Sequence, residues 1–286
     1  MPWIKKVFVT AYRMFWSCIF RLLFGREWFA RHRKYNKLVF ARHLMEILLS
    51  GYVRRIGNLA QIKLLNGMIV LLPFGVDVGI IVRDIFIDEV YDRFYKPCDN
   101  DIVIDIGAHV GLFSIKVCRN VKRVIAIEPN PFNYKLLLTN LHLNRIENVT
   151  PIKLAISNYS GIAKLYLGRG SSDHTIKPLS KMSHSSSIAV QVETLDNLID
   201  EIGLSKVNFI KIDVEGAELD VLKGSERTLA NNDLFLAIAA YHYPEEIFEV
   251  AKFLRARGMK VFSDGAYIYA FKQKGSRISV KPPIAS

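Results

Sequence analysis

Residues 101–113 (DIVIDIGAHVGLF) combine an apolar strand, an acid and a glycine turn, and this combination restricts the chain to few folds. The apolar run 102–104 leads to Asp105, and the turn 107–111 follows it. A helix-like segment and a second apolar strand come next, and that strand ends in Glu128. Strand, glycine turn, helix, strand and acid in this order are typical of the first half of a doubly wound nucleotide-binding fold.

The glycine turn distinguishes between nucleotide ligands. A dinucleotide site requires G-x-G-x-x-G, because the middle glycine lets the backbone approach the pyrophosphate. This chain has His109 at that position, so a pyrophosphate would meet a side chain. S-adenosylmethionine has no phosphate, its cationic methionine end suits Asp105, and its ribose hydroxyls can donate hydrogen bonds to Glu128. The pattern therefore favours S-adenosylmethionine over NAD.

Charge is distributed unevenly along the chain. Residues 1–55 hold 12 Lys and Arg against two acids, so they carry +10 of the net charge of +12. A nucleic-acid groove normally concentrates basic residues around the active site, so this distribution argues against a nucleic-acid partner. The three cysteines form no C-x-x-C pair, which indicates neither a zinc site nor a disulfide scaffold and predicts a cytoplasmic protein.

The basic N-terminal part has a helical pattern. At about 100° per residue, its polar side chains between residues 6 and 21 form one stripe and the other residues are mostly apolar. A transmembrane helix would place Arg13 near its middle, at a cost of about 2.5–3.5 kcal/mol. A helix lying on an anionic membrane surface fits better, which predicts peripheral binding to the inner face of the membrane through residues 1–55. The alternative is a helix packed against the catalytic domain.

Two segments before residue 99 are expected to lead into the first strand. Residues 61–72 are predicted to form a hairpin, because two strand-like runs flank Asn66 and Gly67, a pair typical of a type I′ turn. Residues 88–93 are expected to be helical, either as a cover over the cofactor or as a solvated helix.

An inserted pair of strands is predicted in the second half of the domain. Strand-like runs at 162–167 and 188–192 are expected to pair antiparallel. Between them, the polar run 179–187 is the predicted mobile loop. His174 and His184 lie in this region and are expected to roof the acceptor site.

A second motif, at 207–219, contains three carboxylates within six residues. Its apolar strand delivers Asp213 to the carboxyl edge of the sheet, where open α/β folds bind ligands. Asp213, Glu215 and Glu218 are compatible with a divalent cation. Glu218 is equally suited to capping the next helix and Glu215 to holding the loop, and we favour this interpretation without a metal.

The strand-like run 234–239 ends in Tyr241 and His242, which places His242 at the same sheet edge as Asp213. The pKa of a histidine lies near neutrality, so His242 is a candidate base for an acceptor hydroxyl. The alternative is a histidine that anchors its own loop.

Five motifs resemble the FkbM family of S-adenosylmethionine-dependent methyltransferases over roughly residues 80–240. They are Asp105-Ile-Gly-Ala-His-Val-Gly, Ile127-Glu-Pro-Asn-Pro, Ala155-Ile-Ser-Asn, Glu193-Thr-Leu-Asp and Lys211-Ile-Asp-Val-Glu-Gly-Ala-Glu. The resemblance implies an α/β fold with a doubly wound, seven-stranded, mostly parallel sheet and a reversed final strand. It also implies O-methylation of a hydroxyl on a sugar, glycan, lipid-linked or small natural-product acceptor. The family often has an acid where this chain has Ala240, which puts that acid's role in doubt here.

The motifs and the resemblance together give a set of expected site residues. His242 and Asp213 are the expected catalytic pair. The expected cofactor-binding residues are Asp105, Gly107, His109, Gly111, Glu128, Pro129, Asn130, Ala155 and Asp213. Four parts are predicted: a helical appendage (1–58), a lead-in hairpin and helix (59–98), the methyltransferase domain (99–275) and a tail (276–286). Two alternatives remain, an RNA methyltransferase and a non-catalytic membrane adaptor that retains the fold.

Overall fold

The computed structural model divides the chain into two units, Met1–Arg83 and Asp84–Ser286. It describes residues 53–64, 67–74, 78–86, 88–168, 170–178 and 186–272. The membrane-binding prediction falls on residues 1–55, almost all of which lie outside the described residues, as do His184, most of the loop 179–187 and the tail 276–286. Within the described part of the chain, no helix has both the length and the apolar character needed to cross a bilayer.

The first unit contains a three-stranded antiparallel sheet, and helix α4 (Val78–Phe86) begins in this unit and ends in the second. Its strands are β1 (Val53–Ile56), β2 (Leu59–Lys63) and β3 (Ile69–Pro73). The predicted hairpin is confirmed, but beyond the Lys63–Ile69 pair the Leu64 N–H still donates a 2.7 Å hydrogen bond to the Met68 carbonyl, so three residues connect the strands where a type I′ turn has two. Gly67, at φ 82°, supplies the left-handed residue that ends such a loop. The first strand was not expected, because its residues fall in the predicted helical appendage.

The second unit is built on a seven-stranded sheet in the order β12-β13-β11-β10-β4-β5-β6. Its strands are β4 (Ile102–Ile106), β5 (Arg123–Ile127), β6 (Val149–Ile152), β10 (Phe209–Ile212), β11 (Phe235–Ala239), β12 (Lys260–Ser263) and β13 (Tyr267–Phe271). Five neighbouring strands are parallel, and β13 runs antiparallel to both of its neighbours. The predicted doubly wound sheet with a reversed final strand is confirmed.

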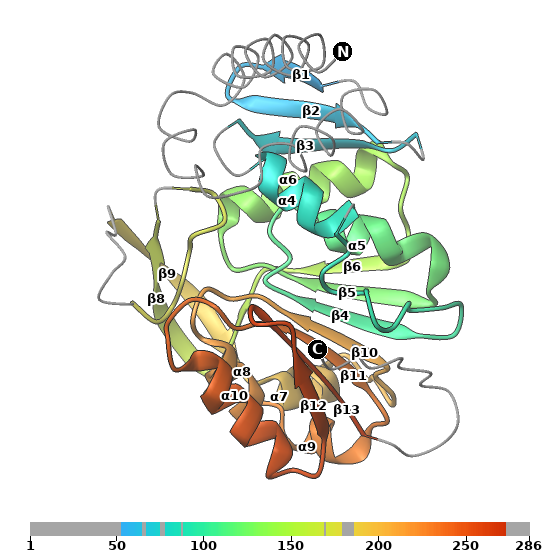
Figure 1. Cartoon of the computed structure of the whole chain (residues 1–286). Helices are drawn as coiled ribbons and strands as arrows, with labels where there is room; N and C mark the ends of the chain where they lie inside the picture. Colours follow the sequence, from blue (N-terminus) through green and yellow to red (C-terminus); the bar gives the residue numbers. More distant parts are fainter. Residues whose placement is uncertain are drawn as a thin grey trace, which may run out of the picture. The chain divides into compact units, whose positions relative to one another are not determined.

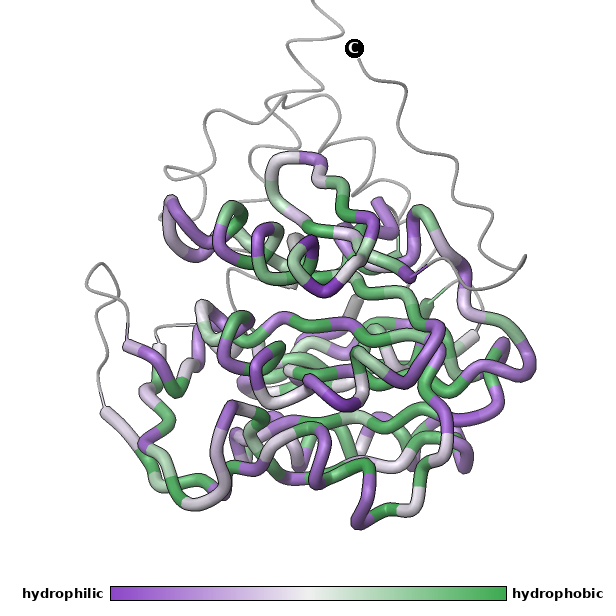
Figure 2. Tube along the Cα trace, turned by 90° about the horizontal axis from the view of Figure 1, so that it is seen from below, coloured by the Kyte–Doolittle hydropathy of each residue, from purple (hydrophilic) through white to green (hydrophobic). Residues whose placement is uncertain are grey.

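Helices cover both faces of this sheet (Figure 1). They are α5 (Leu112–Val117), the 3-10 turn η1 (Cys118–Asn120), α6 (Pro131–Leu143), α7 (Leu195–Glu201), α8 (Glu218–Lys223), α9 (Glu226–Asn231) and α10 (Glu246–Arg255). On one face, Ile104 of β4 belongs to a buried cluster with Leu222 of α8 and Leu254 of α10. On the other face, Phe113 of α5 stacks on Phe209 of β10 with ring centroids 5.8 Å apart. Figure 2 shows hydrophobic residues concentrated along the central strands, as expected for a sheet buried on both sides.

Local sequence signals explain where the second crossover helix starts. The Asn130 side chain accepts hydrogen bonds from the backbone N–H groups of Phe132 (2.9 Å) and Asn133 (3.2 Å). Pro131 occupies the first helical position, where its missing N–H costs nothing. Asn130 and Pro131 therefore determine where α6 begins.

A second, three-stranded sheet stands beside the large one in Figure 1. It consists of β7 (Ala155–Ile156), β8 (Gly161–Leu167) and β9 (Ser186–Glu193), in the order β7-β9-β8. The predicted antiparallel pair β8–β9 is confirmed. Strand β6 of the large sheet stops at Ile152, and Ala155 pairs instead with Val192 of β9.

The helix expected at residues 88–93 is not present. The helix lies earlier, at α4, and residues 90–92 form turns. Glu89 adopts a left-handed φ of 50°, which is incompatible with a continuous helix. The turn still brings Tyr91 to the carboxyl edge of β10, where its hydroxyl donates a 2.6 Å hydrogen bond to Asp213.

Candidate functional site

Asp105 is fully buried beneath the glycine turn, in strand β4. Its Oδ2 accepts a 2.7 Å hydrogen bond from the Ser114 hydroxyl, and its Oδ1 lies 3.2 Å from the Lys211 ammonium of β10. Lys211 also donates a 2.6 Å hydrogen bond to the Gly107 carbonyl. The buried ion pair therefore fixes the start of the glycine turn from below, and Asp105 acts on the turn through Lys211.

Gly107 allows the glycine turn to touch the end of β10. It has a left-handed φ of 74°, and a Cβ at this position would lie 1.8 Å from the Asp213 carbonyl oxygen. No side chain fits in that space. The two sequence motifs, about a hundred residues apart, thus meet backbone to backbone at the carboxyl edge of the sheet.

Glu128 lies at the tip of β5 and is only 5% exposed. Its Oε2 accepts a hydrogen bond from the His109 N–H (2.9 Å) and its Oε1 from the Asn130 N–H (2.8 Å). Burial raises the pKa of Glu128 to about 7, although these two backbone donors favour the ionised form. Each carboxylate oxygen keeps a second lone pair, so the group can accept two further hydrogen bonds.

His109 has a left-handed φ of 55° in the glycine turn. Its Nε2 lies 3.0 Å from the Ser171 hydroxyl, which belongs to the segment that follows β8. Burial lowers the pKa of His109 to about 3, and the nearby charge of Lys211 acts in the same direction. His109 is therefore a neutral ring that links the glycine turn to Ser171.

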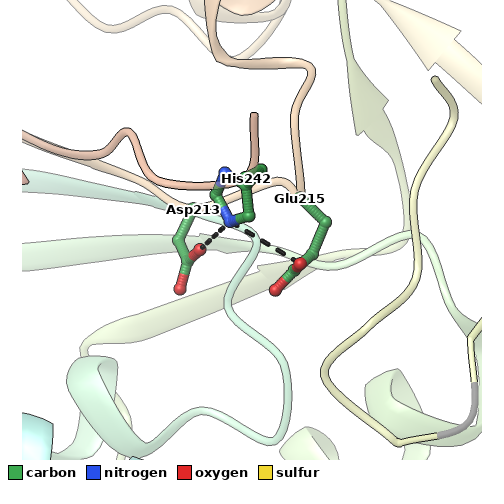
Figure 3. A group of neighbouring side chains, drawn as sticks. All are labelled: Asp213, Glu215 and His242. Atoms are coloured by element: carbon green, nitrogen blue, oxygen red, sulfur yellow. Dashed lines mark ion pairs between the residues drawn. The ribbon is translucent and has the colours of Figure 1, made fainter. Parts of the chain in front are cut away.

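At the other end of the same sheet edge, the His242 side chain is 2% exposed and surrounded by acids. Figure 3 shows its ring nitrogen Nε2 between Asp213 and Glu215. The distances are 3.7 Å to Asp213 Oδ1 and 3.6 Å to Glu215 Oε2, both too long for a hydrogen bond. The other ring nitrogen, Nδ1, lies 3.1 Å from Glu246 Oε2 and 3.5 Å from Glu218 Oε1. We call the four acids Asp213, Glu215, Glu218 and Glu246 the carboxylate cage.

The cage changes the charge of the histidine. Burial alone would lower the pKa of His242, but the charge of Glu218, the hydrogen bond with Glu246 and the charge of Asp213 together raise it to about 9. A protonated ring has no lone pair with which to accept a proton. This arrangement therefore disfavours the base function that the sequence predicts for His242.

Glu218 and Glu246 are both fully buried in side chain, and they share the binding of His242 and its loop. Glu218 accepts hydrogen bonds from the N–H groups of Val214 (2.8 Å) and Gly216 (2.9 Å), both in the loop before α8, so it holds this loop and does not cap the helix as the sequence suggested. Burial opposes ionisation of Glu218, whereas the charge of His242 and the Val214 N–H act to lower its pKa. Burial opposes ionisation of Glu246 too, but hydrogen bonds from His242 and Glu218 lower its pKa.

The structure brings some of the expected site residues together and leaves others apart. Asp105, Gly107, His109, Glu128 and Asn130 form one connected group. Gly111 meets Leu137 of α6 and Pro129 is half-buried between Glu128 and Asn130. Ala155 is 5% exposed in the core of the small sheet, which makes its contribution one of packing. His174 accepts a hydrogen bond from the Gly168 N–H within its own loop.

Three residues of this site were missed by sequence reasoning. Lys211 is a charged residue in the buried strand FIKI, which is an unusual position and a usable signal. Glu246 is the first residue of α10, four residues after His242, so its side chain can reach back to the loop that carries His242. Nothing in the local sequence of Tyr91 indicates its contact with Asp213, which spans 122 residues.

The sequence of the second unit matches a known protein family. A family model described as "Methyltransferase FkbM domain" matches residues 105–261. "Methyltransferase 1" of Beauveria bassiana is 29% identical over 170 residues, covering 52% of this chain and 67% of the relative. "Hexuronic acid methyltransferase AglP" of Haloferax volcanii is 28% identical over 150 residues, covering 52% and 60%. A crystal structure of a methyltransferase FkbM from Methylobacillus flagellatus has 22% identity and a TM-score of 0.46, covering 68% of this chain and 52% of that chain.

Proposed function

Because the chain belongs to the FkbM methyltransferase family, whose model matches residues 105–261, we propose that it transfers a methyl group from S-adenosylmethionine to a hydroxyl oxygen. The observation that carries this proposal is the geometry of Glu128. Both of its oxygens are fixed by backbone donors, at 2.8 and 2.9 Å, and both retain a lone pair at the tip of β5. Two adjacent ribose hydroxyls supply two donors, one for each of these oxygens.

The rest of the glycine turn suits the same ligand. Lys211 holds the Gly107 carbonyl, so the turn is rigid without a ligand. The His109 side chain fills the position that a dinucleotide site leaves open for a pyrophosphate. Asp105 is occupied by Lys211 and Ser114, and we assign it to orienting the turn. These residues would hold the ribose and the methionine end, with no place for a diphosphate.

S-adenosylmethionine supplies a methyl carbon on a cationic sulfur, so transfer forms a C–O bond and breaks a C–S bond, whose electron pair stays on sulfur. The protein must then hold the acceptor oxygen in line with the methyl group. We assign this task to the sheet edge between Asp213 and His242. The hydroxyl proton passes to water during or after methyl transfer. Since the cage keeps His242 protonated near neutrality, we assign His242 to positioning and not to proton abstraction.

A sugar hydroxyl is the acceptor class we favour. One relative carries the name hexuronic acid methyltransferase and is 28% identical over 150 residues. Small natural products and lipid-linked glycans present the same hydroxyl chemistry. The competing class is RNA, whose support is the +10 charge of residues 1–55.

Titration calorimetry with S-adenosylmethionine tests the donor half of the proposal. Losing a hydrogen bond to a charged group costs about 1.5–3 kcal/mol, so Glu128→Ala should weaken binding at least tenfold. Glu147→Ala, which removes an exposed acid outside the site, is the matched control and should bind as the wild type does. Equal affinity of Glu128→Ala and wild type, or a preference for NAD, would refute the assignment.

Radiolabelled methyl groups test the acceptor half. The purified protein is incubated with labelled S-adenosylmethionine and with separate glycan, lipid and RNA fractions of a cell extract. We expect label in the glycan or lipid-linked fraction, and the label should survive treatment with RNase. Label that follows RNA and disappears with RNase would establish the competing class.

A further inference from the structure

His242 and two acids of the carboxylate cage point three donor atoms toward one another. Asp213, Glu215 and His242 each offer one ligand atom, and these atoms all lie within 4.8 Å of one another. Figure 3 shows Asp213 and Glu215 on either side of the His242 ring nitrogen Nε2. The group combines two carboxylates with one imidazole at the carboxyl edge of the sheet. We propose that these three atoms bind a divalent cation of the Mn²⁺ type. Glu218, which the sequence suggested as a third carboxylate ligand, instead holds the backbone of its own loop.

Two of the three donor atoms are buried and have no hydrogen-bond partner. They are Asp213 Oδ1 and His242 Nε2. The His242 side chain is 2% exposed, so solvent does not satisfy its nitrogen. A direct N–H···O bond would bring the nitrogen to about 2.7–3.2 Å from an oxygen, whereas the separations are 3.7 and 3.6 Å. Separations of this size between the nitrogen and the two oxygens are expected when an ion lies between the atoms.

The opposite ends of the same side chains are firmly held. The Tyr91 hydroxyl donates to Asp213 Oδ2 at 2.6 Å, so Oδ1 is the oxygen that faces His242. Glu246 Oε2 lies 3.1 Å from His242 Nδ1 and also accepts the His242 backbone N–H at 2.8 Å. A carboxylate on the outer nitrogen of a metal-binding histidine fixes the ring orientation and raises the basicity of the inner nitrogen. The cage therefore has the second layer that metal sites require.

The ligand set selects among cations. Carboxylates suit Mg²⁺ and Mn²⁺, and an imidazole shifts the preference toward transition metals, so Mn²⁺ satisfies both. Adjacent ligands of an octahedral ion at about 2.1 Å lie about 3 Å apart, so the three side chains need to move inward by less than 1 Å. Binding would displace the proton from His242 Nε2, because a metal ligand must be the neutral ring.

Three protein ligands leave coordination positions for other groups. If the proposed O-methyl transfer is correct, an acceptor hydroxyl could occupy one of them, since a bound cation lowers the pKa of the hydroxyl it coordinates. This use rests on the proposed function, but the binding of the cation does not. The two can therefore be tested separately.

Electron paramagnetic resonance of the full chain, stripped with EDTA and titrated with Mn²⁺, tests the site. We expect one bound ion per chain and nitrogen modulation from His242 in pulsed spectra. Asp213→Asn and Glu215→Gln should each weaken Mn²⁺ binding at least tenfold, and His242→Gln should remove the nitrogen signal. Glu215 is the most suitable of the three to replace without disturbing the fold, because Asp213 is bonded to Tyr91 and His242 to Glu246.

Glu128→Ala is the matched control on the other side of the sheet edge. It should lose affinity for S-adenosylmethionine and keep Mn²⁺, whereas Glu215→Gln should lose Mn²⁺ and keep S-adenosylmethionine, which also shows that the variant is folded. No stoichiometric Mn²⁺ in the wild type, or wild-type Mn²⁺ affinity in folded Glu215→Gln, overturns the metal site. Failure of both the wild type and Glu215→Gln to bind S-adenosylmethionine would instead overturn the proposed function.

Discussion

Both ends of the sheet edge contain buried charged side chains, but these side chains are paired differently at the two ends. At β4 and β5, which we call the donor side, Asp105 and Glu128 are satisfied by direct contacts of 2.7–3.2 Å with protein groups. At β10 and β11, the acceptor side, His242 Nε2 and Asp213 Oδ1 face each other at 3.7 Å without a hydrogen bond. On the donor side, Asp105 Oδ1 makes no hydrogen bond but lies 3.2 Å from the Lys211 ammonium, whereas on the acceptor side the facing atoms stand further apart.

The largest effect is expected from breaking the ion pair that completes the donor side. Lys211→Met leaves the Asp105 carboxylate buried without its counter-charge, and removing one partner of a buried pair costs about 3–5 kcal/mol. We expect the free energy of unfolding, measured with urea, to fall by that amount. Lys223→Met removes a lysine that is 46% exposed and 3.7 Å from Asp220, and it should change stability by less than about 0.5 kcal/mol. A Lys211→Met protein of wild-type stability would show that the donor side does not depend on this pair.

The pH dependence of cofactor binding sharpens the comparison from the donor side. The pKa of Glu128 is raised to about 7, so folding favours its protonated form, and its contribution to stability is complete below the ordinary pKa and is lost as pH rises through about 7. The affinity for the ligand changes with pH in the opposite direction and rises as Glu128 ionises, because ribose hydroxyls donate hydrogen bonds to the carboxylate. Affinity for S-adenosylmethionine should therefore fall up to about tenfold per pH unit below pH 7. Calorimetry between pH 5.5 and 8 measures this, and Glu128→Gln should flatten the profile.

The smallest effect is expected where a single hydrogen bond orients the acceptor side. Tyr91→Phe removes the 2.6 Å bond to Asp213, at a cost of about 1.5 kcal/mol, so turnover should fall about tenfold while affinity for S-adenosylmethionine stays unchanged. Tyr95→Phe removes a similar 2.7 Å bond to Asp101 before β4 and is the matched control. If both variants keep wild-type turnover, the orientation of Asp213 is not limiting.

The donor side could largely be predicted from the sequence, because its signals are local. The apolar strand before Asp105, the glycine turn and the cap at Asn130 each lie within a few residues of the feature they determine. The same holds for the order of strands and helices. Periodicity and capping report neighbours along the chain, and this side is formed mainly by neighbours.

The acceptor side could be predicted only in part, because its chemistry depends on distant residues. The sequence places Asp213 and His242 at one edge, but the state of the ring is decided by Glu218 and Glu246, which pack around it. The contact of Tyr91 with Asp213 depends on where the chain turns after α4, and that turn was predicted to be a helix. The position of Ala155 likewise follows from its pairing with β9 and not from its own motif.

The missing side chain of Gly107 has a consequence for the spacing of the reaction. A Cβ there would fall 1.8 Å from the carbonyl oxygen of Asp213, so even alanine would force the two loops apart. Reacting atoms must approach to about 3–3.5 Å before a bond can form, and the donor and acceptor loops are in close contact at Gly107. If these loops hold the two substrates as proposed, residue 107 limits the distance between the methyl donor and the acceptor oxygen. Glycine at this position allows the short distance, and a methyl group there would lengthen it.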